Sequence, residues 1–379
     1  MTTPTSTPVT AIRARFPSLA HTVHLATCSI TARSTDLDHA LTAMADDLAG
    51  CGFWAACEEQ LRHARQRFAH LIDAHTDQVM IVPNARIAAL QAVAGRRWRS
   101  RPDLLGSYAE FPGIAHAWLA QQSGGAQVRW CDTTEDAYLS AITTRTALVS
   151  VPAVTYRDAI GLDVARIANA AHAAGAAVFV DAYQAAGVMP LSVDTLRCDY
   201  LVAGTGKYLL GLPGLAFLYA RDPHRIGFEP ATDHDRHAAF DTDVPTPAFR
   251  FTAGTPSAAA AYTAAAGLTL IETLDLTQVR RHTQQLITDA AHRLTAQGET
   301  VRLHHDPDRQ GAHLALVVPN AEATATHLAR QHITVAPRGG VVRVAVHAYT
   351  THDDITALCD ALATSRTGTN SRQPTGAHR

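Results

Sequence analysis

The chain has 379 residues, of which 47% are hydrophobic, so it is long enough to form two domains with substantial cores. A formal net charge of −2 excludes the strongly basic surface that is typical of proteins that bind nucleic acids or anionic membranes. The 21 histidines are scattered, with no His-Glu-x-x-His or Cys-x-x-Cys motif, and we therefore expect no metal site.

The chain ends and the cysteines indicate a cytoplasmic protein. The stretch from Met1 to Thr10 is rich in Thr and Pro and lacks the apolar segment of a signal peptide, and no run approaches the roughly 18 apolar residues of a membrane-spanning helix. The six cysteines are widely spaced, which is typical of reduced thiols rather than of a disulfide framework.

Hydrophobic patterning predicts alternating helices and strands over the first two thirds of the chain. Helices are expected from Phe53 to Ala74, from Pro83-Asn84 to about Trp98 with Asn84 as the N-cap, and from Val164 to Ala174. This alternation predicts an α/β fold with a mostly parallel seven-stranded sheet and helices on both faces. The expected strands are Val79–Val82, Leu104–Tyr108, Gln127–Cys131, Thr146–Val151, Ala177–Asp181, Tyr200–Ala203 and Leu215–Tyr219.

A smaller α+β domain is predicted for the C-terminal third. Its expected helices and strands, in chain order, are helices from Pro256-Ser257 past Ile271 and over Leu276–Gln297, strands Val301–Leu303 and His313–Val317, helix Glu322–Gln331, strand Val341–Val346 and helix Asp353–Ala363. We therefore divide the chain into an N-terminal arm that joins the small domain (1–25), a large cofactor-binding domain (26–255) and the small domain (256–364). The polar residues 365–379 contain Gly and Pro and are expected to form a disordered tail.

Two residues at predicted strand ends indicate the chemistry. Asp181 ends one strand, and Lys207 follows the next strand within Gly204-Thr205-Gly206-Lys207. Ligands of open α/β sheets bind beyond the carboxyl ends of the strands, so we expect the acid and the amine to lie near each other. Pyridoxal phosphate needs a lysine for its Schiff base and an acid for its pyridine nitrogen. The pair therefore favours this cofactor, although the same two features also occur in α/β proteins without it.

Four segments extend this pattern across a little under half of the chain, from Val178 to Ile355. In order they are VFVDAYQAAGVMPLSV, CDYLVAGTGKYLLGLPGLAFLYAR, FRFTAGTPSAAAAY and VVRVAVHAYTTHDDI. In this order and spacing they resemble class V aminotransferase-fold enzymes, which include cysteine desulfurases, kynureninases and isopenicillin N epimerase-like enzymes. The resemblance implies the fold-type-I architecture of pyridoxal phosphate enzymes and a homodimer with active sites at its interface.

The resemblance also implies the principal roles. Lys207 would form the Schiff base with the cofactor, Asp181 would pair with the pyridine nitrogen, and Arg343 would bind the α-carboxylate of the substrate. An arginine within Val341–Val346 is costly to bury unpaired. Carboxylate recognition is a good reason to keep it there, and a solvated face of an edge strand is the alternative.

Further cofactor contacts follow from the same resemblance. Gln184 would contact the phenolic oxygen, Phe111 would stack on the ring, and Tyr156 takes the position of a family Asn near the cofactor hydroxyl. Thr255 matches a residue that in many relatives reaches the phosphate of the neighbouring subunit. A polar residue at a helix start is the competing interpretation of Gln184, and a core side chain is that of Phe111.

The cofactor phosphate is expected at the N-terminus of the helix near Asn84, because free backbone N–H groups and the helix dipole favour an anion there. The candidate contacts are Asn84, Ala85, Arg86, Ile87 and the hydroxyl of Thr205. The family often has Thr-Thr at this helix start and this chain does not. Arg86 would supply a charge instead, or is simply a solvated side chain.

Three departures from the family pattern limit the functional prediction. The loop HITVAPRGGVVRV has no Cys where cysteine desulfurases carry their nucleophile, which disfavours persulfide transfer. Gly206 replaces the family's His before the lysine, and RIGFEPATDHDRHAAF stands where kynureninases have a Trp/Gly/His loop. We expect the pocket for the substrate side chain to come from loops such as Thr27–Thr31 and Ile226–Pro245.

The predicted function is that of a pyridoxal phosphate-dependent enzyme that acts on an amino-acid-type substrate through a carbanion at Cα. The favoured reaction is cleavage of a C–S or C–C bond beta to the amine in a biosynthetic pathway, as in the cysteine-conjugate lyases of lincosamide-type antibiotic pathways. Transamination or decarboxylative deamination is the first alternative, and epimerisation would need a second proton donor. A non-catalytic binding protein on the same fold is also an alternative, against which Lys207, Asp181 and Arg343 argue.

Overall fold

The computed structural model describes residues 9–223 and 254–370. The last helix, α12 (His352–Asn370), continues into the stretch that was expected to be disordered, so residues 365–370 are helical, and the rest of that stretch lies outside the described residues. Within these ranges, no helix has both the length and the apolar character to cross a bilayer.

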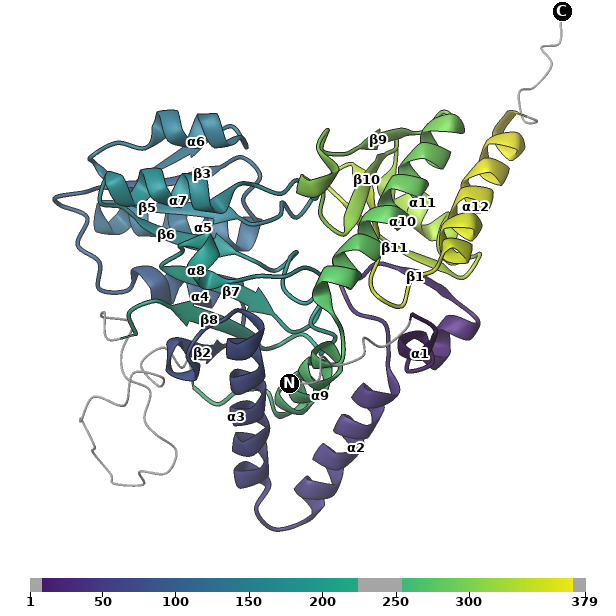
Figure 1. Ribbon diagram of the computed structural model, residues 1–379, viewed down its shortest axis with the longest axis horizontal. Coiled ribbons are helices and arrows are strands. Elements are labelled where there is room, and N and C mark those ends of the chain that lie inside the picture. Colours follow the sequence, from purple (N-terminus) through teal and green to yellow (C-terminus); the bar gives the residue numbers. More distant parts are fainter. Residues whose placement is uncertain (1–8, 224–253, 371–379) are drawn as a thin grey trace, which may run out of the picture.

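The large domain is built on the predicted seven-stranded sheet, in the order β2-β8-β7-β6-β5-β3-β4 (Figure 1). Its strands are parallel except that β8 runs antiparallel to both of its neighbours, so the sheet is mostly parallel as expected. The bounds are β2 (Val79–Val82), β3 (Asp103–Ser107), β4 (Gln127–Cys131), β5 (Thr146–Pro152), β6 (Ala177–Asp181), β7 (Tyr200–Gly204) and β8 (Ala216–Ala220).

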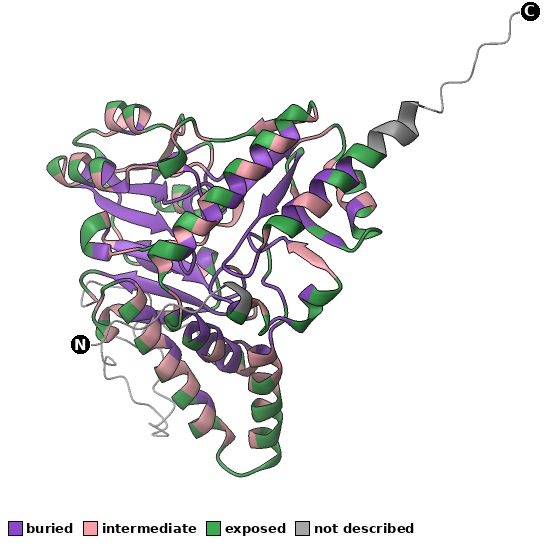
Figure 2. Cartoon of the chain, turned by 45° about the vertical axis from the view of Figure 1, so that its right-hand side comes forward, coloured by how far each residue is buried: buried purple, intermediate pink, exposed green. Residues whose placement is uncertain are grey.

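Helices cover both faces of this sheet, which explains why its central strands are continuous apolar runs. In β6, Val178 and Val180 pack into the core on one face, whereas Ala177 and Phe179 pack into the core on the other. In Figure 2 most strand residues are coloured as buried, whereas the helices combine buried, intermediate and exposed residues. The helices are α2 (Thr35–Ala49), α3 (Phe53–Leu71), α4 (Ala85–Val93), α5 (Pro112–Ala120), α6 (Glu135–Ala141), α7 (Val164–Ala173), α8 (Val193–Leu196) and α9 (Ala258–Glu272).

The prediction that the second helix runs to about Trp98 is wrong, because α4 ends at Val93. Two residues further on, Gly95 has a φ of 70°, a left-handed conformation that a helix cannot include. The start is as predicted: Asn84 is the N-cap, and its side chain accepts a hydrogen bond from the N–H of Ile87.

The small domain holds a five-stranded sheet in the order β1-β11-β12-β10-β9. The N-terminal segment contributes its edge strand, β1, which pairs in parallel with β11. The strands are β1 (Val23–Leu25), β9 (Thr300–Arg302), β10 (His313–Val317), β11 (Ile333–Arg338) and β12 (Val341–Ala345), and the helices on one face are α10 (Leu276–Ala296), α11 (Ala321–Ala329) and α12. The other short helices in the described part of the chain are α1 (Val9–Arg13), η1 (Pro17–Ala20), η2 (Thr76–Gln78), η3 (Gln121–Gly124) and η5 (Pro307–Arg309).

Helix α9 belongs with the large domain. It packs against α2 and α3, and Ala261, Ala264 and Leu268 are part of the core on that side of the seven-stranded sheet. A boundary between residues 255 and 256 therefore separates α9 from its own core. We propose that the small domain begins after Glu272 instead.

Candidate active site

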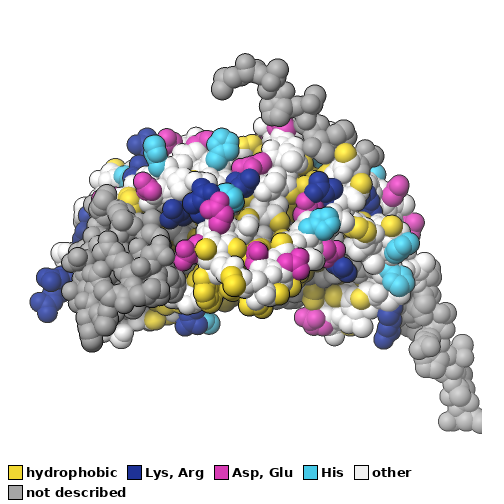
Figure 3. All heavy atoms as spheres, turned by 90° about the horizontal axis from the view of Figure 1, so that it is seen from below, with side chains coloured by type: hydrophobic (Ala, Val, Ile, Leu, Met, Phe, Trp, Pro, Cys, Tyr) yellow, Lys and Arg dark blue, Asp and Glu magenta, His cyan; other side chains and the backbone are white. Residues whose placement is uncertain are grey.

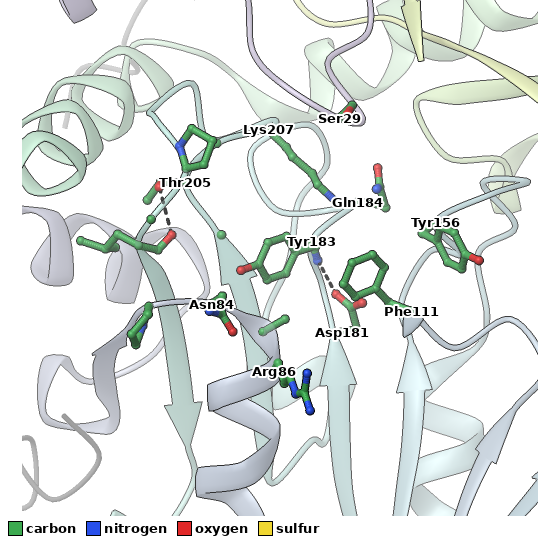
Figure 4. A pocket seen from close by; sticks show the side chains of 17 residues that line it. Ser29, Asn84, Arg86, Phe111, Tyr156, Asp181, Tyr183, Gln184, Thr205 and Lys207 are labelled. Atoms are coloured by element: carbon green, nitrogen blue, oxygen red, sulfur yellow. Dashed lines mark hydrogen bonds between the residues drawn. The ribbon is translucent and has the colours of Figure 1, made fainter. Parts of the chain in front are cut away.

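A cavity of about 270 Å³ lies beyond the carboxyl ends of β6 and β7 and beside the start of α4 (Figure 4). Most of the predicted site residues lie in its wall, although they come from separate strands, helices and loops. They are Lys207, Asp181, Gln184, Phe111, Tyr156, Asn84, Ala85, Arg86 and Thr205. Arg343, Ile87 and Thr255 are not among the lining residues.

Lys207 and Asp181 share this wall, and burial acts on both. Burial lowers the pKa of the Lys207 ammonium, and the nearby Asp181 carboxylate partly opposes that effect. Burial likewise raises the pKa of Asp181, opposed by the Tyr183 backbone N–H, which donates to Oδ1 over 2.9 Å, and by Lys207. A lowered ammonium pKa favours the neutral amine, which is the form that attacks a carbonyl carbon.

Lys207 is also the one lysine among the 32 lysine and arginine residues of the chain. Every other basic side chain of these two types is an arginine, whose guanidinium stays protonated and cannot form a Schiff base. The chain therefore keeps a primary side-chain amine at one place, in the wall of this cavity. Counting lysines in the sequence would have given this signal.

Phe111 is positioned by its neighbours on both sides. It precedes Pro112, which starts α5, and its backbone N–H donates to Oε1 of Glu110 over 3.1 Å. The ring centre lies 5.8 Å from the Lys207 nitrogen, so Phe111 is not a plain core residue.

Glu110 itself was not expected at the site. Burial raises the pKa of its carboxyl group to about 7, although the Ser150 hydroxyl donates to Oε2 and opposes this effect.

Tyr183 is a second residue that the sequence patterns did not single out. The Lys207 nitrogen lies 5.0 Å from the centre of its ring. A Cβ atom at Gly204 would overlap this ring, so the glycine makes room for the tyrosine. Burial raises the pKa of the phenol, and a hydrogen bond from the Ala85 backbone opposes that effect, so the hydroxyl lies at the N-terminus of α4.

Gln184 presents an unsatisfied acceptor to the cavity. Its side chain is 2% exposed, and Nε2 donates to the backbone carbonyl of Cys28 over 3.1 Å. Its Oε1 atom is buried and has no hydrogen-bond partner among the described residues. A buried acceptor without a partner costs about 1–3 kcal/mol, which a donor group on a bound molecule would recover.

Two of the predicted phosphate contacts need correction. The N–H of Ile87 already donates to Oδ1 of Asn84 over 3.1 Å, so it is not available to an anion. The hydroxyl of Thr205 donates to the carbonyl groups of Leu212 and Leu215, so its single proton stabilises the turn after β7. Ala85 and Arg86 remain at the helix start in the cavity wall.

Arg343 lies on β12, a central strand of the small sheet, and is 5% exposed. The alternative of a solvated edge face is therefore wrong. Its Nη1 donates to the carbonyl of Tyr156 over 2.9 Å, and Nε donates to the carbonyl of Ala336 over 3.4 Å. It forms no ion pair with a described carboxylate, so a bound anion would satisfy a buried charge.

The remaining predicted loops are only partly described. Ser29, from Thr27–Thr31, lines the cavity as expected. Ile226–Pro245 and the segment RIGFEPATDHDRHAAF lie outside the described residues. Thr255 is exposed, and its contact with a second subunit stays a prediction.

The cavity meets the chemical requirements of pyridoxal phosphate. It offers an amine and a carboxyl group in one wall, an aromatic ring beside them, an unsatisfied acceptor at Gln184 and a helix N-terminus with Arg86 for an anion. In Figure 4 the side chains of Lys207, Asp181 and Phe111 point toward the same space. The residues present therefore fit the group.

Comparison with known proteins places the chain in one family. The family model described as Aminotransferase class-V matches residues 52–358. The chain is 32% identical to the protein named uncharacterized aminotransferase YcbU of Bacillus subtilis, over 93% of this chain and 96% of that protein.

Solved structures show the same fold. An apo structure of a cysteine desulfurase from Thermococcus onnurineus NA1 superposes with a TM-score of 0.82 at 19% identity and covers 97% of this chain and 100% of its own. The cystine C–S lyase C-DES, solved with its reaction product cysteine persulfide, superposes with a TM-score of 0.82 at 20% identity, over 92% of this chain and 99% of its own.

Proposed function

The chain belongs to the aminotransferase class-V family and is a pyridoxal phosphate-dependent enzyme, and on that premise we propose that it is a lyase. The proposed reaction cleaves a C–S or C–C bond beta to the amine of an amino-acid-type substrate. Bound pyridoxal phosphate supplies an electron sink that stabilises negative charge at the Cα atom of an attached amine. The cofactor-dependent chemistry on which the proposal rests is supported by one observation, that the only lysine of the chain lies in one cavity with Asp181.

In this proposal the cofactor would be held by groups along the whole cavity. Lys207 would hold its aldehyde carbon and Asp181 its pyridine nitrogen. The ring would lie beside Phe111, and the first residues of α4 would bind the phosphate. Burial raises the pKa of Asp181, so a cationic ring nitrogen beside it would restore the ionised carboxylate.

The chain's own residues would then bind the substrate and move its proton. Arg343 would hold the α-carboxylate with its buried guanidinium, a bidentate donor suited to this group. The amine of Lys207, whose pKa is lowered by burial, would accept the proton from Cα. The same side chain would return a proton to the departing group on the next carbon.

Two features favour a lyase over desulfuration or epimerisation. No cysteine is among the described lining residues, so a persulfide carrier is missing there. Epimerisation needs a second proton donor on the other face of Cα, whereas the proposed elimination uses Lys207 alone. Transamination is the second candidate, and the 32% identity to YcbU favours it.

We propose that the enzyme is a homodimer in the cytoplasm. Figure 3 looks onto the face that carries α2 and α3, where hydrophobic side chains are exposed among charged ones. Leu48 and Trp54 are 63% and 57% exposed there, which suits a surface that a second copy covers. None of the six cysteines is in a disulfide, as suits a reducing compartment. Light scattering at several concentrations tests the dimer.

Product analysis tests the reaction type. The holoenzyme is incubated with cysteine, S-substituted cysteines and other amino acids, and thiol, ammonia, 2-oxo acid and pyridoxamine phosphate are measured. Release of thiol together with ammonia supports the lyase, and accumulation of pyridoxamine phosphate supports transamination. Lys207→Arg is the matched control, because it keeps a positive charge but cannot form the Schiff base. Lack of any product from the whole panel contradicts the proposal.

A further inference from the structure

A second arginine lies at the edge of the cavity. The Arg338 guanidinium is 5.9 Å from the centre of the Phe111 ring and 5.7 Å from that of the Tyr156 ring, and both rings line the cavity. A guanidinium beside an aromatic ring is attracted to it and still has N–H groups that can donate to a bound anion. Arg338 is exposed and forms no ion pair with a carboxylate of the described chain.

The strand register places this arginine on the same face of the small sheet as Arg343. Gly339 and Gly340, with φ of 55° and 81°, form a two-residue turn of the kind that joins β11 to β12 tightly. Arg338 then pairs with Val341, and Ala336 pairs with Arg343. Because residues two apart on a strand point to the same face, the two arginines share one face.

The opposite face of this sheet is apolar and packs against helices. Val335, Val342 and Val344 belong to the core that α10, α11 and α12 cover. Residues of the arginine face, such as Ala336 and Ala345, belong to a different core, which also contains Tyr208, the neighbour of Lys207. The face with the two arginines is therefore directed toward the large domain and the cavity.

The charge on this face is not neutralised by the described residues. Arg338 and Arg343 both lower the pKa of Lys207, which means that both cations act on the reacting amine. His313, on β10 of the same face, is fully buried, and burial lowers its pKa to about 3, so it is neutral. A substrate with one carboxylate would pair with Arg343 and leave Arg338 without an anion.

We propose that the substrate is an amino acid whose side chain ends in a second acidic group, a carboxylate, sulfonate or phosphonate, and that Arg338 binds this group. The proposal rests on the proposed function, in which Arg343 takes the α-carboxylate. Arg338 then determines specificity, because a neutral side chain would leave its guanidinium solvated rather than paired. Diagonal positions on neighbouring strands lie about 7–8 Å apart, so one small molecule can span both cations.

Binding of matched amino acids to the holoenzyme tests this proposal without turnover. The visible absorbance of the bound cofactor is titrated with L-glutamate and L-2-aminoadipate, and with the neutral partners L-glutamine and L-norleucine. We expect each acidic amino acid to bind about 10- to 100-fold more tightly than its neutral partner, since a hydrogen bond to a charged group contributes about 1.5–3 kcal/mol. Cysteate and 2-amino-4-phosphonobutyrate then distinguish a sulfonate or phosphonate from a carboxylate.

Three variants identify the residue. Arg338→Gln should remove the preference for the acidic side chain and leave the affinity for the neutral partners within about twofold, whereas Arg338→Lys should keep part of the preference. Arg330→Gln removes the same charge from an exposed position at the end of α11 and should change neither affinity.

An unchanged preference in Arg338→Gln, or equal binding of acidic and neutral partners by the wild type, overturns the inference. In both cases the absorbance change still reports amino-acid binding, so the proposed function stands. If no amino acid changes the spectrum, the proposed function fails as well.

Discussion

The side-chain nitrogen of Lys207 lies 5.0 Å from the centre of the Tyr183 ring, and the backbone N–H of the same tyrosine holds the carboxylate of Asp181 over 2.9 Å. One residue therefore contacts the reacting amine with its ring and fixes the acid with its main chain. The phenol reaches the start of α4, where the cofactor phosphate is expected. Tyr183 thus links the three regions that the cofactor must contact at once.

The Tyr183 hydroxyl is predicted to bind the cofactor phosphate. In Tyr183→Phe the affinity for pyridoxal phosphate should fall by about tenfold, because one hydrogen bond to a charged group is lost. The affinity for pyridoxal, which has no phosphate, should stay within about twofold. Both affinities are measured by titrating the apoprotein. An equal loss for both aldehydes would mean that the hydroxyl acts on the fold and not on the phosphate.

Gly204 is predicted to be required by the ring of Tyr183. A methyl group at Gly204 would overlap the ring, so Gly204→Ala should lower the free energy of unfolding by about 1–3 kcal/mol. In a Tyr183→Ala background the same substitution should cost much less, because the ring is gone. Urea unfolding of the four proteins of this double-mutant cycle measures the coupling. If the stability losses of the two single substitutions simply add in the double variant, Gly204 is needed for a reason other than the ring.

Glu110 is predicted to make stability depend on pH. Burial raises its pKa in the folded protein from 4.5 to about 7, so the folded state binds more protons than the unfolded state between these values. Its contribution to stability is fully present below about pH 4.5 and is lost as the pH rises through about 7, with a total of about 3 kcal/mol. Glu110→Gln should therefore lose less stability than the wild type over this range. Thermal unfolding at a series of pH values measures the difference, and parallel curves would contradict the prediction.

Arg343 is predicted to recognise the α-carboxylate. Arg343→Gln should weaken amino-acid binding by about 10- to 100-fold, because a charge-assisted bidentate contact is lost. Arg343→Gln should still bind the cofactor, since Arg343 is not among the residues that line the cavity. Amines without a carboxylate provide the control and should bind both proteins alike. A loss of the same size for these amines would assign Arg343 to the packing of β12 instead.

The sequence predicts the large sheet well because its strands are buried on both faces. Runs such as Ala177–Val180 are apolar throughout, which is typical of strands that are buried on both faces. These runs end at or just before the residues of the site. Because neighbouring parallel strands end at the same edge of the sheet, Asp181 and Lys207 lie near each other. The strand β11 was missed because Pro337 interrupts its pattern. It is tolerated because it lies beyond Val335, where the pairing with β1 ends.

Other features depend on contacts that no local pattern contains. The importance of Tyr183 is evident only beside Gly204, which lies on the neighbouring strand. The N–H of Ile87 was expected to be free, yet the cap formed by Asn84 uses it. The direction of Arg338 follows from the turn at Gly339 and Gly340, and a shift of one residue would turn it to the other face.

The central claim is that the amine of Lys207 carries the cofactor, and peptide mass analysis after borohydride reduction tests it most directly. The chain has no other lysine, so the N-terminal amine is the only other primary amine that can be reduced onto the aldehyde. We predict that the phosphopyridoxyl mass appears on the peptide that contains Lys207 and is absent from Lys207→Arg. A protein that binds pyridoxal phosphate but yields an unmodified Lys207 peptide would contradict the account.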